Sequence, residues 1–573
     1  MDQFFGMFSQ ADSATIHVYQ QTMRYLIPVL VTLLLIRCIR PLLTFRREPE
    51  IWAWLKLEDD RLLPITHWES IIGSSKRSDV VISLPGVSKT HAVLTRYDDG
   101  SWTISDRGTK SGIRVNGERI DICALEPEDE INIGGVNMHL VPISRRQELK
   151  LAELRTKATH PIHSIANVLL LTVIQCLIGI SYLFALDIQY AQPVFTGFLG
   201  MMICQWALLI FYICIKKPSF EIEAIAFFLC TMGMAAIAAV KPGESVKQLL
   251  ALVMGLSLFL FLGWAMRDLE RAKKLRYYAA VAGVGFLLIT MLFGQEYHGA
   301  KNWIVIGGMS FQLSELSKVC FVFVGASTMD RIVNKRNLIL FIGYTLAVCG
   351  CLAVMNDFGT ALIFFTAFLL IAYIRSGSVG TVALACTSLG FAGVIALKIA
   401  PHALRRFSSW RHIWEDPLNK GYQQTRAIMC LASGGLFGLG AGKGWMENVF
   451  AADSDVVIAT VAEEWGLLIV LMMICCVLAF GMFAIRSAAV ERSTFFTIGS
   501  CAAAGILLVQ AILNALGTVD ILPLTGVTFP FVSNGGSSMI GTWGLLAFVK
   551  AADTRQNASF AVRQSKEGRP DDE

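Results

Sequence analysis

Charged side chains are scarce in this chain of 573 residues, and their scarcity excludes most soluble architectures. Asp, Glu, Lys and Arg make up 16% of the residues, whereas a typical soluble chain has about 25%. Hydrophobic residues make up 54%, and the mean hydropathy is +0.56. A disordered chain, a fibrous repeat or a secreted disulfide scaffold would leave far more of its sequence in water. The composition therefore predicts an integral membrane protein.

The chain also lacks a large excess of charge of one sign. Its 49 basic and 44 acidic side chains leave a formal net charge of +5, which gives no reason to expect a nucleic-acid partner. The 14 cysteines mostly lie in apolar runs and form no pair of CxxC motifs with metal-site spacing. We interpret them as small core side chains, and we predict no metal-binding residues.

Long apolar runs are abundant. Between residues 161 and 552, about twelve runs of roughly 18 to 25 residues alternate with short loops, and this is the length that a membrane-spanning helix needs. A further apolar segment, 25–36, predicts a transmembrane anchor within residues 1–44. The expected fold class is therefore a polytopic α-helical membrane protein with about twelve helices plus one N-terminal anchor.

The basic residues predict the orientation of these helices. They follow the anchor and then cluster on alternate loops, which by the positive-inside rule places residues 45–145 and the tail, 553–573, in the cytoplasm. The composition of the tail cannot build a core, so we expect it to be disordered. Three loops should lie outside: 294–313, 400–456 and 518–534. We expect the chemistry there, because a loop longer than about 15 residues is usually functional.

Residues 45–145 read as a separate all-β domain, followed by a basic linker, 146–160. Short β-rich runs alternate with Gly, Asp and Ser turns every ~8 to 12 residues, which predicts a β-sandwich. Small and polar residues of this domain occur in the order Gly73, Ser88, His91, Asp106, Gly112, Asn116 and Gly117. This order resembles the forkhead-associated (FHA) family, whose members bind phosphothreonine peptides through loops at one end of the sandwich.

The resemblance implies a phosphopeptide site and a partner, either a phosphothreonine protein or a Ser/Thr kinase. The implied binding residues are Ser88, Lys89, His91, Lys110 and Asn116. Ser74 stands where the family has an arginine, and Ser111 where it has an asparagine. A doubly charged phosphate favours a bidentate arginine, which a serine hydroxyl cannot replace. Lys89 and Lys110 either supply that charge or belong to an ordinary solvated loop.

Charged residues beside or inside the apolar runs need a partner or a function, because burying a charge in the membrane costs ~3 kcal/mol or more. Glu315 and Lys318 are three residues apart on one helix face and could neutralise each other. Glu463 and Glu464 follow Asp455 by eight and nine residues, about 12 Å further along one helix. These two carboxylates should either meet cations or line a wet cavity.

Asp455 begins that helix, and two interpretations are open. An aspartate at such a position is commonly a helix N-cap. It also stands at the outer mouth of the membrane domain, after a cationic loop suited to a pyrophosphate. The basic residues of that loop are Arg405, Arg406, Arg411, Arg426 and Lys443.

Six segments of the membrane part look like the successive signatures of one family. They are GAKNWIVIGGMSFQLSELSK, NDFGT, DPLNKGYQ, SGGLFGLGAG, DSDVVIATVAEEWG and LPLTGVTFPFVSNGGSS. They resemble the SEDS family (FtsW, RodA, SpoVE) over roughly residues 160–552. That family polymerises peptidoglycan from lipid II at the outer face of the bacterial cell membrane, in a complex with a class B penicillin-binding protein. The resemblance therefore implies a peptidoglycan glycosyltransferase that inverts the anomeric carbon.

Asp455 occupies the position of the family's essential extracellular aspartate and would act as the general base. Asp453 stands two residues earlier, so an exchange of roles remains open. The lipid pyrophosphate leaving group needs positive charge, from Lys301, Arg406 or Lys443 and from a divalent cation such as Mg²⁺ or Mn²⁺; no other cofactor is implied. The remaining implied substrate-binding residues are Trp303, Gln312, Glu315, Lys318, Gln423, Glu463, Glu464, Ser533, Gly535, Gly536 and Ser537.

Some alternatives remain open. The glycines between residues 434 and 442 could contact phosphate or could serve tight turns and close packing. The membrane part could transport lipid II instead of polymerising it. It could also be a scaffold, with the FHA-like domain as the working module for a phosphorylated division protein.

Overall fold

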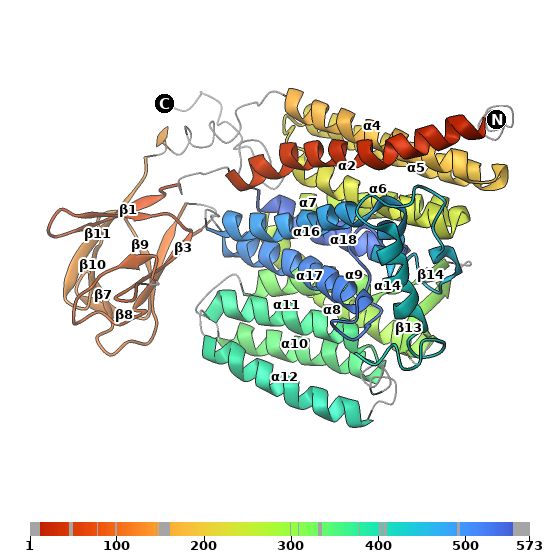
Figure 1. The fold of residues 1–573 in the computed structure, drawn as a ribbon. Helices are drawn as coiled ribbons and strands as arrows, with labels where there is room; N and C mark the ends of the chain where they lie inside the picture. Colours follow the sequence, from red (N-terminus) through yellow and green to blue (C-terminus); the bar gives the residue numbers. More distant parts are fainter. Residues whose placement is uncertain are drawn as a thin grey trace.

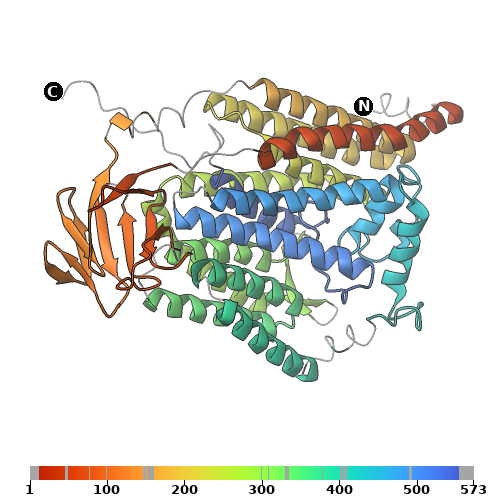
Figure 2. The same ribbon diagram turned by 60° about the vertical axis from the view of Figure 1, so that its left-hand side comes forward.

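The computed structural model describes residues 12–44, 50–76, 78–97, 100–144, 146–147, 150, 161–297, 300–306, 309–329, 335–376, 379–399, 404, 410–489 and 493–553. Most of the predicted linker, 146–160, and all but the first residue of the predicted tail, 553–573, lie outside these described residues. The chain forms a bundle of helices with a β-sandwich at one end (Figure 1). Figure 2 shows the same arrangement from a second direction.

The sandwich consists of two sheets. The first contains, in spatial order, β2 (Leu62–Ile65), β1 (Ala53–Leu57), β11 (Val136–Pro142), β10 (Glu130–Ile133), β7 (Ile113–Val115) and β8 (Glu118–Ile120). The second contains β4 (Val80–Val81), β3 (Glu69–Gly73), β5 (Ala92–Arg96), β6 (Trp102–Asp106) and β9 (Ile122–Leu125). Neighbouring strands are antiparallel, except for β3 and β4. Inward side chains such as Leu55, Ile104 and Leu140 form a core separate from that of the helices, which confirms the predicted sandwich.

The helices of the bundle begin with α2 (Ser13–Thr44), the predicted anchor. Before the first long loop come α4 (Ile162–Ala185), α5 (Ile188–Cys214), α6 (Glu221–Val240), α7 (Ser245–Met266) and α8 (Leu269–Phe293). After it come α9 (Ser314–Thr328), α10 (Lys335–Val354), α11 (Phe358–Ser376) and α12 (Val379–Ile399). The last group is α15 (Val457–Trp465), α16 (Leu467–Ala488), α17 (Thr494–Thr518) and α18 (Gly536–Ala551).

Within the described part of the chain, ten helices are long and apolar enough to cross a membrane. The thirteen spans expected from the sequence also include α9, α12 and α18. Helices α9 and α18 have only 15 and 16 residues, whereas a span usually needs about 20. Among the described residues, the structure therefore supports about ten candidate spans by length and composition, in a polytopic membrane protein, and α12, with 21 residues, has the length of a further span.

A polar network fastens α4 and α5 to α6. The side-chain amides of Gln175 and Gln205 exchange hydrogen bonds of 3.0 and 2.8 Å, and Gln175 also donates to the Thr231 hydroxyl at 3.1 Å. All three side chains are fully buried. Because polar groups among apolar helices must find one another, the network favours one packing arrangement of these three helices.

The sandwich contacts the bundle through Glu69 at the start of β3. Its Oε2 atom lies 3.4 Å from Nη1 of Arg375, at the end of α11, and accepts a 3.3 Å hydrogen bond from the hydroxyl of Thr494, at the start of α17. The Glu69 and Arg375 side chains are only 7% and 13% exposed. A single carboxylate thus joins the sandwich to two helices.

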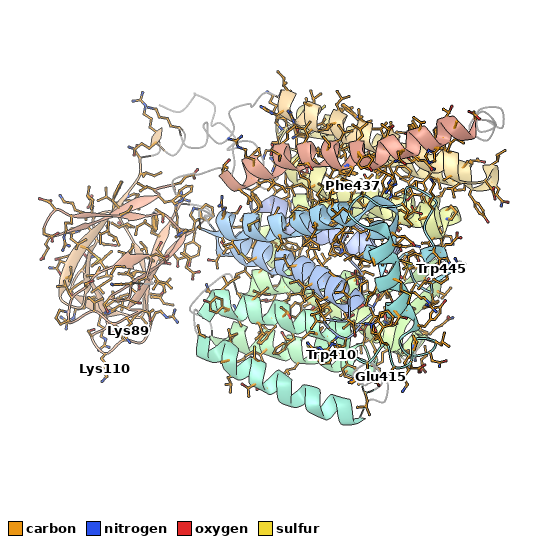
Figure 3. All side chains as sticks on the ribbon, viewed as in Figure 1. Lys89, Lys110, Trp410, Glu415, Phe437 and Trp445 are labelled. Atoms are coloured by element: carbon orange, nitrogen blue, oxygen red, sulfur yellow. The ribbon has the colours of Figure 1, made fainter. Side chains whose placement is uncertain are left out.

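The loops expected outside lie at the opposite end of the bundle, which we call the loop end (Figure 1). Residues 295–311 form a small sheet there, with strands β12 (Gln295–Tyr297), β13 (Ala300–Ile306) and β14 (Met309–Phe311). Helix α14 (Tyr422–Gly434) and the single helical turns Pro242–Glu244 and Met446–Asn448 complete it. Figure 3 shows Trp410, Glu415, Phe437 and Trp445 at this end.

Candidate functional site

Asp455 lies at the loop end, in the turn that precedes α15. Its side chain is half-buried. Its backbone N–H donates to the Ala451 carbonyl (3.0 Å), and its own carbonyl accepts from Nδ2 of Asn514 on α17 (2.9 Å). The N-cap of α15 is Val456, so the N-cap interpretation of Asp455 was wrong. Both backbone polar groups of Asp455 are thus held, and its carboxyl group is presented from a fixed turn.

Asp453 is sequestered by a cation and an amide. Nζ of Lys241 lies 3.1 Å from both carboxylate oxygens of Asp453, and Nδ2 of Asn534 donates to Oδ2 at 2.6 Å. Asp453 is 1% exposed, whereas the Lys241 side chain is 49% exposed. Asp453 is buried and both of its carboxylate oxygens are bonded within the protein, whereas Asp455 is half-buried, which favours Asp455 over Asp453 for the role of base.

The loop between α17 and α18 clamps the Asp455 turn. The Ser533 hydroxyl donates to the Ser454 carbonyl (2.7 Å) and accepts from the Phe529 N–H (2.8 Å), and the Asn534 N–H donates to the Asp453 carbonyl (2.7 Å). Ser533 is 2% exposed. The geometry therefore gives Ser533, expected to bind substrate, a fastening contact to the Asp455 turn.

A second cluster at the loop end is centred on Asp357. Its Oδ2 atom accepts from Nδ2 of Asn302 (3.2 Å) and Nε2 of Gln312 (3.3 Å), while Oδ1 caps α11 through the Thr360 N–H (3.1 Å). The Gln312 N–H donates to the Ser537 hydroxyl (3.0 Å). Three of the motifs found in the sequence therefore meet here, the first through Asn302 and Gln312, the second through Asp357 and the third through Ser537.

Glu315 and Lys318 form the ion pair that their spacing predicted. Oε2 of Glu315 lies 2.7 Å from Nζ of Lys318, and their side chains are 6% and 1% exposed. The expected neutralisation is confirmed. Gly535 and Gly536, from the motif expected to bind substrate, stand at the start of α18, where Gly535 is the N-cap.

The expectation that Glu463 and Glu464 meet cations or a wet cavity was wrong. Oε2 of Glu463 accepts from the Trp445 and Met446 N–H groups at 2.9 and 3.0 Å. Oε1 of Glu464 accepts from the Gly442 N–H at 3.0 Å, and Oε2 accepts from a buried tyrosine hydroxyl at 2.6 Å. Both carboxylates are buried and hold the backbone of the 442–446 loop, because carboxylates bind backbone N–H groups strongly.

The glycine run between residues 434 and 442 packs against the end of α15. Gly438 has φ +78° and approaches the Glu464 carbonyl so closely that a Cβ atom would overlap it. The N–H groups of Leu439 and Gly440 donate to the carbonyls of Glu463 and Glu464 at 2.8 and 3.0 Å. Of the two interpretations left open, the geometry supports close packing.

The cations expected around the leaving group are only partly described. Arg406 and its neighbour Arg405 lie outside the described residues, Lys301 is half-buried and Lys443 is exposed. The guanidinium groups of Arg411 and Arg426 lie over the rings of Trp410 and Tyr422. The Gln423 side chain donates to the Phe450 carbonyl at 2.9 Å, and Trp303 is half-buried in β13.

Sequence reasoning missed Lys241 and Asn514. A signal for Lys241 existed, because it follows α6 on a turn that the alternation of spans places outside, where the positive-inside rule disfavours lysine. Asn514 gave no such signal, since an asparagine near the end of an apolar helix has many possible roles.

In the sandwich, the expected phosphopeptide residues fall into two groups. His91 is fully buried; its Nδ1 accepts from the Ser88 N–H and its Nε2 lies 3.1 Å from the Gly112 carbonyl. The Asn116 amide donates to Asp129 (2.7 Å) and accepts from the Glu130 N–H (3.0 Å). His91 and Asn116 therefore make contacts within the domain.

Ser88 and the two lysines belong to the second group. Ser88 is half-buried, and Lys89 and Lys110 are exposed. Figure 3 shows both lysines at the same edge of the sandwich. The Ser111 hydroxyl donates to the Gly86 carbonyl at 3.1 Å, and the Ser74 N–H donates to the Ser88 carbonyl at 3.0 Å. The loops are thus packed on one another, with the lysines outermost.

Two hydrogen bonds lower the pKa of Asp129. The largest cause is the hydrogen bond from the Glu126 N–H (2.8 Å), followed by the bond from the Asn116 amide. Both bonds stabilise the ionised carboxylate. Asn116 therefore serves the loop between β9 and β10.

Comparison with known proteins places this geometry in a family. Residues 234–558, more than half of the chain, match the model of the FtsW, RodA and SpoVE family, which is described as cell cycle protein. The chain belongs to this family. Residues 70–134 match the FHA domain, so this FtsW/RodA/SpoVE protein carries an N-terminal FHA domain.

Curated relatives share the membrane part. The peptidoglycan glycosyltransferase RodA of Mycobacterium tuberculosis (strain ATCC 25618 / H37Rv) is 28% identical over 328 residues, which cover 53% of this chain and 69% of the relative. The probable peptidoglycan glycosyltransferase FtsW of Tolumonas auensis is 30% identical over 361 residues, which cover 59% and 93%.

Two solved structures cover the two parts. One, titled as the structural coordination of polymerization and crosslinking by a peptidoglycan synthase complex, is 23% identical over 58% of this chain and 96% of its own, with a TM-score of 0.48. The other, from a study of phosphothreonine-dependent FHA domain interactions, is 21% identical over 16% and 98%, with a TM-score of 0.16.

Proposed function

We propose that this protein polymerises lipid II into glycan strands at the outer face of the bacterial cytoplasmic membrane, in cell division or cell-shape maintenance, with Asp455 as the general base. Homology to RodA and FtsW makes it a peptidoglycan glycosyltransferase. The observation that carries the assignment to Asp455 is the clamp on its turn. Asn514 holds the Asp455 carbonyl, while Lys241 and Asn534 occupy the carboxylate of Asp453.

The chemistry needs one carboxylate. Asp455 accepts the proton of the acceptor sugar's 4-hydroxyl while the oxygen of that hydroxyl attacks the anomeric carbon of the donor. The bond from this carbon to the lipid pyrophosphate breaks, and the carbon is inverted. A positioned general base contributes about 10²- to 10⁴-fold to such a rate. The pyrophosphate leaves as a stable anion, so it needs positive charge rather than a proton.

Lysines at the loop end supply that charge in this proposal. Lys443 is exposed and Lys301 is half-buried. Cations near a departing pyrophosphate stabilise the charge that develops in the transition state. A divalent cation remains a prediction; among the described residues no three His, Cys, Asp or Glu side chains cluster as metal ligands.

The orientation follows the positive-inside rule. The sandwich and the loop end lie at opposite ends of the bundle (Figure 1), so a cytoplasmic FHA domain puts Asp455 on the outer side, where a class B penicillin-binding protein would crosslink the product. Lys89, Lys110 and Ser88 would bind a phosphothreonine protein or a Ser/Thr kinase, and the FHA domain would regulate polymerisation.

The test uses purified full-length protein with lipid II. Wild type should form glycan polymer, and Asp455→Ala should form none while it still binds lipid II. A transporter would flip lipid II without forming polymer, and Asp455→Ala would leave flipping intact. Polymer formation by Asp455→Ala at the wild-type rate would overturn the assignment of the base. Loss of phosphothreonine-peptide binding in Lys89→Ala/Lys110→Ala would support the role of the FHA domain.

A further inference from the structure

Three helices precede the region that matches the family, and two of them contact the loop end. The family match begins at residue 234, inside α6, so α2, α4 and α5 lie before it. The ring of Tyr25 on α2 lies 5.0 Å from that of Phe437. At the end of α4, a Cβ atom on Gly442 would lie 2.6 Å from Cβ of Ala185. The added helices thus pack directly on the glycine-rich loop.

Tyr182 of α4 makes the polar contact of this interface. Its hydroxyl donates to Oε2 of Glu464 at 2.6 Å and accepts from Nε1 of Trp465 at 3.1 Å. Tyr182 is fully buried. The other oxygen of Glu464 accepts from the Gly442 N–H at 3.0 Å. A chain of hydrogen bonds therefore runs from an added helix, through Glu464, to the residue next to Lys443.

The loop that Glu464 holds leads to the Asp455 turn. Met446 and Val449 pack with Ala452 and Val456 in one small buried cluster, and these last two residues flank the Asp455 turn in the sequence. A shift of the backbone at Gly442 would therefore displace Lys443, while this buried cluster still holds the Asp455 turn.

We propose that Tyr182 is a positioning residue for glycosyl transfer, which fixes through Glu464 the backbone that places Lys443 against the lipid pyrophosphate. The inference rests on the proposed function. It gives α4 a part in substrate binding, together with the hydrogen bond by which Gln175 holds α4 against α6. Lys443 would contact the pyrophosphate before and during the reaction, so loss of its placement should raise KM for lipid II more than it lowers kcat.

The experiment compares Tyr182→Phe with Tyr212→Phe in the full-length protein. Tyr212 is a matched control, because it is also fully buried and its hydroxyl also donates to a glutamate, Glu223, at 2.9 Å. Glu223 forms an ion pair with Lys550, which lies at the opposite end of α18 from the Asp455 clamp. We expect Tyr182→Phe to raise KM for lipid II about tenfold with kcat changed less than twofold, and Tyr212→Phe to leave both unchanged.

Two further measurements separate positioning from a purely structural role. In a Lys443→Ala background, Tyr182→Phe should change KM less than twofold, since the placed group is gone. The affinity of Asp455→Ala for lipid II should fall about tenfold when Tyr182→Phe is added. The inference would be overturned if Tyr182→Phe left both KM and the affinity for lipid II unchanged. It would also be overturned if Tyr182→Phe raised KM equally in the wild-type and Lys443→Ala backgrounds. The binding measurement needs no turnover, so it decides the inference even if wild type makes no polymer, a result that would instead remove the proposed function.

Discussion

Lys241 engages both carboxylate oxygens of Asp453 at 3.1 Å, and this contact joins the turn after α6 to the turn before α15. The two residues are 212 positions apart in the chain. Lys241 therefore matches the charge of Asp453 inside the protein, and Asn534 donates a further hydrogen bond to the same carboxylate. Two aspartates that look equivalent in the sequence are thereby given different roles.

Substitution of the two aspartates should separate these roles. Asp455→Asn should lower kcat by about 10²- to 10⁴-fold, the usual contribution of a general base. Asp453→Asn removes the partner of Lys241 but leaves the base, so we expect a fall of about tenfold, arising from a looser turn. Initial rates of glycan polymerisation from lipid II measure both. Equal losses in the two variants would contradict the division of roles.

Asn514 should be essential for the geometry of the Asp455 turn. Its Nδ2 atom donates to the carbonyls of Asp455 and Val527 at 2.9 and 2.8 Å. Asn514→Leu would leave these acceptors unpaired, at about 1–3 kcal/mol of stability, and should lower polymerisation at least tenfold. Gln510→Leu is the control, one turn earlier on α17, because the buried Gln510 amide has no hydrogen-bond partner among the described residues. It should retain activity and the wild-type melting temperature.

The buried Glu315–Lys318 pair makes a prediction about stability. Glu315→Gln or Lys318→Met leaves one charge buried without its partner, which typically costs about 3–5 kcal/mol. The double variant removes both charges, so its loss should be smaller than that of either single variant. Melting temperatures in detergent provide the comparison. Additive losses would mean that the two side chains do not act as a pair.

Glu69 should hold the FHA domain against the bundle. Glu69→Gln removes the charge that faces Arg375 and weakens the bond from Thr494. We expect faster amide hydrogen exchange in β3 and at the first turn of α17, because these segments lose their shared contact. Glu118→Gln, on the exposed strand β8, is the matched control and should leave exchange at both segments unchanged.

The lowered pKa of Asp129 predicts that the stability of the FHA domain depends on pH. Hydrogen bonds lower its folded-state pKa below the ordinary value of 3.8, so its contribution to stability is complete above that value and is lost as the pH falls through the lowered folded-state pKa. Asn116→Ala should raise that pKa and shrink the acid-induced loss. Residues 45–145 have a core of their own, so circular dichroism melting of this fragment between pH 2 and 6 tests the prediction. Identical curves would contradict it.

Much of the architecture could be predicted from local sequence patterns. Apolar runs indicated the helices because the membrane demands about 20 apolar residues per span, and turn spacing indicated the sandwich. The i,i+3 spacing of Glu315 and Lys318 predicted their ion pair, since both belong to one helix. The number of spans was overestimated where α9 and α18 are short.

The roles of side chains that meet across the fold could not be predicted in this way. Glu463 and Glu464 looked like candidates for cations, yet their partners are backbone N–H groups and Tyr182. No local pattern reveals that a tyrosine 282 positions away donates a hydrogen bond to the Glu464 carboxylate.

The amino-acid sequence by itself determined that the chain is a membrane protein, where the separate β domain lies and which aspartate stands in the family's motif, because hydropathy, turn residues and motif order are local properties of the chain. Only the tertiary structure decided that Asp453 is paired with Lys241 and that Asn514 holds Asp455. Such contacts depend on how helices that are distant in the sequence pack together. Only then can the Asp453 carboxylate find a cation and the Asp455 carbonyl find a hydrogen-bond donor.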